Sequence, residues 1–115
     1  ATGGVGAGVF GAWVQIVAAG ILPDPAWLVG LDAVFNTITE YNIRFGTGNL
    51  GVEAELDPVV RAIANSTNVG MVYQGAIPTI PRRVDGSPRV VAAISTMAGA
   101  GAETATFRIA FGRSL

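Results

Sequence analysis

The chain has 115 residues and a mass of 11.7 kDa, which suits one domain with its own core and is too short for two. Its net charge of −1 and sequence pI of about 5.1 provide no general attraction to nucleic acid or to an anionic membrane, so neither is an expected partner. Because the chain contains no His and no Cys, imidazole bases, thiolate nucleophiles and most zinc sites are excluded, and we expect a protein that is not an enzyme and holds no cofactor or metal.

The N-terminal part of the chain carries no charge before Asp24. It is long enough to cross a bilayer, but its many glycines make a poor helix and no Lys or Arg flanks it, which disfavours a membrane span or a signal peptide. Residues 1–8 contain four glycines and too little side chain to fold alone. We therefore expect a flexible glycine-rich arm over residues 1–8, ordered by a neighbouring molecule, and a single β-sandwich domain over residues 9–115.

Most of the remaining chain alternates between apolar and polar or small residues with a period of two, which is typical of half-buried β-strands. In residues 40–45, for example, Tyr41, Ile43 and Phe45 face one way and the polar residues between them face the other. The expected strands span residues 10–16, 27–35, 40–45, 52–56, 90–94 and 105–111, with a weaker candidate at 69–77.

Clusters of turn-forming residues separate these strands. Short strands punctuated in this way predict an all-β fold, either an antiparallel β-sandwich or a small barrel. One segment differs, because Asp57 is a candidate N-cap, Pro58 suits the first helical position and apolar residues follow at helical spacing. We therefore allow one short helix near residues 57–64. The expected turns cover residues 20–25, 36–37, 46–51, 65–68, 78–88 and 97–101.

The stretch FGTGNLG, residues 45–51, spells the glycine fingerprint of a dinucleotide-binding loop. Such a loop follows a strand buried on both faces, opens a helix and needs an acidic residue about 20 positions later. Here the preceding strand has a polar face, the following residues alternate, and no Asp or Glu lies near that distance. We interpret Gly46, Gly48 and Gly51 as a structural turn between two antiparallel strands, where positive φ is needed.

Carboxylates and tryptophans are the remaining candidates for chemistry. Glu53 and Glu55 lie on the polar face of one expected strand, roughly 6.5–7 Å apart, as alternate residues of a strand do. Such a pair could hydrolyse glycosides, but a solvated strand face is the preferred interpretation. Trp13 and Trp27 could form a platform for a sugar, although large aromatics in a sandwich more often belong to a core or an interface. We expect no catalytic residue.

Charged residues make up 13% of the chain, about half the usual share. A small domain has much surface, so this scarcity predicts that part of the surface is buried against other subunits, although a bias in nucleotide composition is an alternative explanation. All seven cations are Arg, which forms two-pronged ion pairs and tolerates interfaces better than Lys does. Arg82, Arg83 and Arg89 could bind phosphate, but the surrounding charge is not basic, so we expect them to pair with carboxylates across a subunit contact.

Three passages resemble small virion proteins of tailed bacteriophages. Residues 41–53 are similar to a strand, a GTGxxGxE turn and a second strand of those proteins. Residues 77–94 resemble their proline-led strand, glycine-containing turn and Arg-bearing strand of small residues, although Pro88 stands directly before the Arg in this chain. Residues 27–35 match the tryptophan-led strand that precedes both. The resemblance covers about two thirds of the chain, residues 27–94, in the same order.

The resemblance implies a jelly-roll-like β-sandwich that sits on a capsid or a tail, commonly as a trimer. We therefore expect a non-enzymatic virion structural protein, a capsid decoration or cement protein that is assembled in the host cytoplasm. Its expected partners are further copies of itself and a major capsid protein or another virion protein. The alternative is a carbohydrate- or receptor-binding module of a phage tail or fibre. The candidate interface residues are Val5, Val9, Phe10, Trp13, Trp27, Arg82, Arg83 and Arg89.

Overall fold

A computed structural model describes residues 1–63 and 72–113, with side chains described outside residues 29–32, 57–63 and 72–82. Within these residues the protein is all β, without a helix. The strands are β1 (Val14–Val17), β2 (Ala26–Phe35), β3 (Glu40–Thr47), β4 (Ala54–Ile63), β5 (Val72–Val84), β6 (Val90–Thr96) and β7 (Ala105–Gly112).

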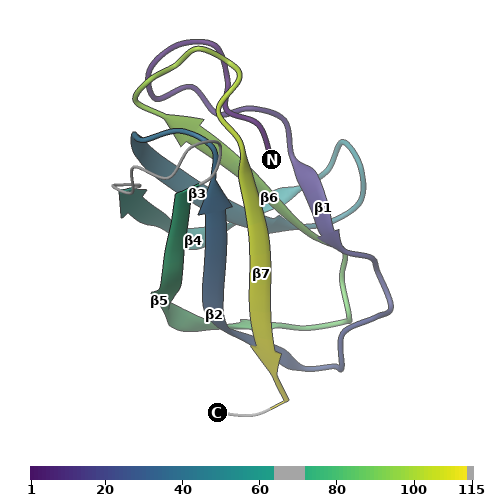
Figure 1. The fold of residues 1–115 in the computed structure, drawn as a ribbon. Helices are drawn as coiled ribbons and strands as arrows, with labels where there is room; N and C mark the ends of the chain where they lie inside the picture. The colour runs from purple at the N-terminus through teal and green to yellow at the C-terminus, as the bar shows by residue number, and fades with distance from the viewer. Residues whose placement is uncertain (64–71, 114–115) are drawn as a thin grey trace.

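The strands form two antiparallel sheets, one with the order β1-β6-β3-β4 and the other with the order β5-β2-β7. In Figure 1 the three-stranded sheet lies in front with its strands upright, and strands β3, β4 and β6 cross behind it. Every connection except that between β3 and β4 passes from one sheet to the other, so the chain builds both layers of the sandwich in alternation. The expected all-β antiparallel β-sandwich is therefore confirmed.

The core lies between the two sheets and follows the alternation seen in the sequence. Tyr41, Ile43 and Phe45 of β3 are almost completely buried and point toward the three-stranded sheet. The ring of Tyr41 stacks on that of Phe35 from β2 with 4.2 Å between centroids, and the ring of Phe45 meets that of Phe107 from β7 edge-on at 6.2 Å. These contacts join the sheets, because each pair takes one ring from either layer.

The helix expected near residues 57–64 is wrong, because β4 continues through residue 63; residue 64 lies outside the described residues. The ladder between β3 and β4 shifts between the rung of Ile43 and the rung of Phe45, and Pro58 falls at this irregularity. A proline in a sheet is tolerated at such a bulge and on an edge strand, and β4 is an edge strand. Pairing with β3 therefore prevails over the local helical signal.

The turn expected over residues 78–88 is wrong for its first half, because β5 continues through Pro78 and Pro81 to Val84. β5 is also an edge strand, so a residue without a backbone N–H can be accommodated there. The strand expected over residues 10–16 begins later than expected, because β1 spans Val14–Val17. The turn expected at residues 65–68 and the first residues of the weak strand at 69–77 lie outside the described residues.

Candidate functional site

The N-terminal segment, expected to be a flexible arm, is hydrogen-bonded to the body of its own chain. Ala1 and Ala105 exchange two backbone hydrogen bonds, of 2.8 and 2.9 Å. The segment then continues antiparallel to the connection between β6 and β7, and Gly3 within it is buried. Its glycines let two backbones meet closely. Further backbone hydrogen bonds run from Gly3 to Glu103, from Gly6 to Gly99 and from Gly8 to Thr96.

The buried carboxylate of Glu103 organises the connection between β6 and β7. It accepts hydrogen bonds from the Thr96 hydroxyl at 2.7 Å, from the Ala100 N–H at 2.8 Å and from the Ala102 N–H at 3.2 Å. The Thr96 hydroxyl is the largest cause that lowers the pKa of this carboxyl, followed by the Ala100 N–H. Sequence reasoning overlooked Glu103, whose signal is a single acidic residue in a run of alanine and glycine.

Three connecting segments meet at one end of the sandwich, at the top of Figure 1, and we call this surface the apolar end. It comprises residues 4–9, 36–39 and 97–102, which contain no charged side chain. The Met97 N–H donates to the Glu40 carbonyl and the Ala98 N–H donates to the Thr39 hydroxyl, both at 3.1 Å. These bonds and the bridge between residues 5 and 100 hold the three segments together. Four large apolar side chains project from it: Val5 (80% exposed), Val9 (47%), Ile38 (56%) and Met97 (52%).

Phe10 and Trp13 lie on the outer face of the four-stranded sheet, where both contact Arg44 of β3. The Arg44 guanidinium carbon is 4.3 Å from the centre of the Phe10 ring and 4.4 Å from that of Trp13. Trp13 also covers Gly46, where an added Cβ would lie 3.1 Å from the indole ring. Gly46 is therefore needed for close approach, and positive φ is found at the two later glycines of the motif. Both aromatics are half-buried by their own chain.

The glycine motif lies in the hairpin between β3 and β4, and Arg89 holds its turn. Gly48 and Gly51 have φ values of +127° and +85°, which favour glycine. The Arg89 guanidinium donates to the Gly48 carbonyl at 3.2 Å, to Gln15 Oε1 at 2.9 Å and to Glu53 Oε1 at 3.3 Å. Arg89, expected at a subunit contact, is thus 15% exposed in its side chain and engaged within its own chain.

The two carboxylates considered as a catalytic pair are engaged by different arginines. Glu53 faces Arg89 and accepts the Gly51 N–H at 3.1 Å, whereas Glu55 lies 3.8 Å from the Arg44 guanidinium. A hydrogen bond from its own backbone N–H is the largest cause that lowers the pKa of Glu53, with smaller contributions from Gly51 and Arg89. Glu53 also lies outside β4. Both carboxylates serve as partners of structural arginines.

The other candidate residues lie on or beside the three-stranded sheet. Arg83 pairs with Asp85 at 2.8 Å, and both side chains are exposed. Trp27 is half-buried on the outer face of β2, in register with Arg83 on one side and Gly112 on the other. The backbone of Arg82 pairs with β2, and its side chain lies outside the described side chains. Arg83 and Arg89 therefore have separate carboxylate partners, both within the chain.

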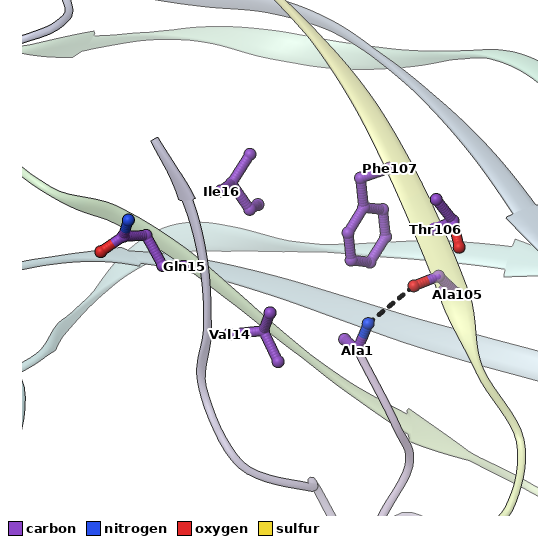
Figure 2. Close-up of a pocket in the computed structure, with 7 residues that line it drawn as sticks. All are labelled: Ala1, Val14, Gln15, Ile16, Ala105, Thr106 and Phe107. Atoms are coloured by element: carbon purple, nitrogen blue, oxygen red, sulfur yellow. Dashed lines mark hydrogen bonds between the residues drawn. The ribbon is translucent and has the colours of Figure 1, made fainter. Parts of the chain in front are cut away.

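A cleft of about 260 Å³ opens between the edge strands β1 and β7. Figure 2 shows Val14, Ile16 and Phe107 pointing into it, with Ala1 at one end. No charged side chain lines this cleft. Its lining consists of Ala1, Val14, Gln15, Ile16, Ala105, Thr106 and Phe107.

Comparisons of the chain with protein-family models, with curated proteins and with solved structures find no match. In the part of the chain that the structure describes, no group of three or more His, Cys, Asp or Glu side chains could hold a metal ion. The described residues also include no helix long and apolar enough to cross a membrane. Among the described residues, the apolar end and the cleft each bring together apolar side chains from separate segments without a charged side chain.

Proposed function

We propose that the protein is a non-enzymatic virion structural protein that decorates a phage capsid and strengthens it by burying surface between subunits. The observation that carries this proposal is the apolar end, a surface with several exposed large apolar side chains and no charged ones. In the proposal this end contacts further copies of the chain, with a trimer favoured, and a major capsid protein or another virion protein.

The composition of the apolar end resembles the centre of a protein interface. Such centres are depleted of charged residues and rich in apolar contacts. Ile38 and Met97 project from different connections, so their burial requires a partner that covers both segments. Alanine and glycine between them let a partner backbone approach closely. Together these features give a surface that a partner subunit can pack against, and this function needs no catalytic residue.

The shape of the apolar end is preorganised by the polar groups beneath it. The Glu103 carboxylate fixes the backbone of residues 97–102 from below, and the N-terminal segment is hydrogen-bonded beside it. An interface whose loops are already ordered loses less conformational entropy on association. In the proposed function residues 1–8 therefore act as part of a built surface that the neighbouring subunit covers.

Light scattering after gel filtration and co-sedimentation with empty capsids test the proposal. Ile38→Lys and Met97→Lys place charges on exposed positions, so each variant should fold, while the oligomer dissociates and capsid binding is lost. Val52→Lys is the matched control, because Val52 is 70% exposed in the hairpin turn outside the apolar end. An unaltered protein that is monomeric and fails to sediment with capsids would contradict the proposal.

Trp27 supports the second candidate function, that of a carbohydrate- or receptor-binding module. It is the half-buried tryptophan on an outer sheet face with a glycine, Gly112, beside it, whereas Trp13 is already engaged by Arg44. An indole next to a glycine leaves room for a sugar ring to stack. Retardation of a monomer on a polysaccharide gel, abolished in Trp27→Ala and retained in Trp13→Ala, would favour this function.

A further inference from the structure

A short segment before β1, residues 10–13, runs beside β6, and we call it the strap. It is anchored at both ends. On one side the Gly8 N–H donates to the Thr96 carbonyl at 3.0 Å, and on the other side Val14 begins the pairing of β1 with β6. Between these anchors the strap makes one backbone hydrogen bond among those described, from the Gly11 N–H to the Ile94 carbonyl at 3.0 Å.

The aromatic side chains of the strap reach across the outer face of β6. β1 lies at one edge of β6 and β3 at the other, and both Phe10 and Trp13 contact Arg44 of β3. Their rings therefore pass over β6 to reach the guanidinium. Ala93 of β6 is in register with Arg44 and is completely buried, which is consistent with this cover. The strap is thus held more by its two rings than by its backbone.

Two polar atoms on this outer face are buried without a hydrogen-bond partner, Arg44 Nε and Ser95 Oγ. Ile94 points into the core, so Ser95, the next residue of β6, points to the outer face. Ser95 is only 1% exposed. The two carbonyls that bond the segment belong to the residues on either side of Ser95, so the chain passes directly beside it. Burying such groups unpaired costs free energy, and contact with water restores it.

We propose that the strap is a hinged cover, which opens and closes over β6 while both sheets stay folded. The stacking of Phe10 and Trp13 on Arg44 favours closure, and the burial of two unpaired polar atoms opposes it. Opening turns both rings into solvent and gives Arg44 Nε and Ser95 Oγ access to hydrogen-bond partners. The anchors at Gly8 and Val14 stay in place. This device does not rest on the capsid function.

The residue next to Ser95 shows why the weak point lies on the strap side of β6. The Thr96 hydroxyl donates to the Glu103 carboxylate at 2.7 Å and accepts the Gly99 N–H at 3.0 Å. Neighbouring hydroxyls of one strand are therefore satisfied on one face and unsatisfied on the other. A segment that closes over an unsatisfied group opens at a smaller cost than the rest of the fold, so opening is local.

Hydrogen exchange of the unaltered protein, followed by nuclear magnetic resonance, tests whether the strap opens on its own. The Gly11 amide should exchange at least about a hundredfold faster than the β3 amides that pair with β4 or β6, and faster than the anchoring Gly8 amide. Low concentrations of urea should leave the Gly11 rate nearly unchanged, because local opening exposes little surface. Exchange of Gly11 at the rate of the β3 amides would overturn the proposal.

Ser95→Ala tests the physical cause. Removing the unpaired hydroxyl removes a cost of closure, so the Gly11 amide should exchange at least about fivefold more slowly. Thr96→Val is the matched control, because that hydroxyl has partners, and its loss should not slow the exchange. An unchanged or faster rate in Ser95→Ala would show that a partner reaches this hydroxyl in the closed state, and would overturn the proposal.

Phe10→Ala tests the opposing contribution, because it removes one ring from Arg44. The Gly11 amide should exchange about tenfold faster in this variant, while the rates of the β3 amides stay the same. An unchanged Gly11 rate would mean that the ring does not hold the strap and would contradict the proposal. The measurements on the unaltered chain and on Ser95→Ala decide the question even if Phe10→Ala does not fold.

Discussion

Two glycine-rich turns of this protein are each built around one carboxylate, but their hydrogen-bond partners differ. In the hairpin between β3 and β4, Glu53 accepts a hydrogen bond from Gly51 and is paired with the guanidinium of Arg89. In the connection between β6 and β7, Glu103 accepts only neutral donors among the bonds described, the Thr96 hydroxyl and two backbone N–H groups. The first turn depends on a charge pair, and the second depends on hydrogen bonds from neutral donors.

The glycines of the two turns also differ in what surrounds them. Gly51 has positive φ and open space around it, so its requirement is local. Gly99 has positive φ, and an added Cβ would also lie 2.5 Å from the backbone of Gly6 and Ala7. The requirement for glycine at position 51 is therefore set within the hairpin turn, whereas the requirement at position 99 also depends on the N-terminal segment. The following variants test this difference.

The largest effect is expected from Gly99→Ala. The substitution strains a positive φ and forces the N-terminal segment away, so we expect a loss of about 2–5 kcal/mol in the free energy of unfolding. Gly51→Ala should cost about 1–2 kcal/mol, because backbone strain alone opposes it. Urea denaturation of both variants measures the two values. Equal losses would show that the contact between residue 99 and the N-terminal segment contributes little.

Removal of each carboxylate should also show which turn contributes more to thermal stability. Glu103→Ala leaves the buried Thr96 hydroxyl and two partly buried backbone donors without their acceptor, and we expect the melting temperature to fall by several degrees. Glu53→Ala should lower it less, because Arg89 keeps its hydrogen bonds to Gly48 and Gln15, and water can replace the carboxylate at the exposed N–H of Gly51. Thermal melts followed by circular dichroism compare them. A larger fall for Glu53→Ala would reverse the ranking.

Acid should weaken both turns, because the pKa of each carboxyl is lowered by folding from an ordinary value of 4.5. A lowered pKa contributes stability that is fully present above the unfolded value and is lost as the pH falls through the folded value. The melting temperature should therefore be level above about pH 5 and decline below it. Glu103→Gln and Glu53→Gln should each show a shallower decline, and a profile unchanged in both variants would exclude these carboxyls as the cause.

The smallest effect is expected from salt. At about 1 M salt the difference in melting temperature between the unaltered protein and Arg89→Gln should narrow, because ions screen the pair that Arg89 forms with Glu53. The difference for Glu103→Gln should stay constant, because Glu103 is held by neutral donors. The Arg89 and Glu53 side chains are 15% and 8% exposed, so the screening should be modest. A salt response that is the same for both variants would contradict the distinction.

Local sequence pattern could predict those parts of the fold in which the apolar residues of a strand all face the core. The alternation of Tyr41, Ile43 and Phe45 correctly indicated a half-buried strand, and its apolar face forms the core. The helical pattern at Pro58 was misleading, because an irregular edge ladder accepts a proline that a central strand would reject. The donors to Glu103 lie within seven residues of it in the chain, but a single acidic residue among alanines and glycines does not indicate which nearby groups will point toward it.

The sequence alone was sufficient to predict the all-β fold class, because the period of two is a property of the chain itself. The low charge content is likewise read directly from the sequence. The tertiary structure decided three features: the pairing of Arg89 with Glu53, the burial of Phe10 and Trp13 against Arg44, and the place of β7 at the edge of its sheet. Each of these depends on which distant segments become neighbours. Which segments become neighbours depends on the packing of the two sheets and on backbone hydrogen bonds. Every residue except proline can donate such a bond, so the identity of the side chains says little about which strands pair.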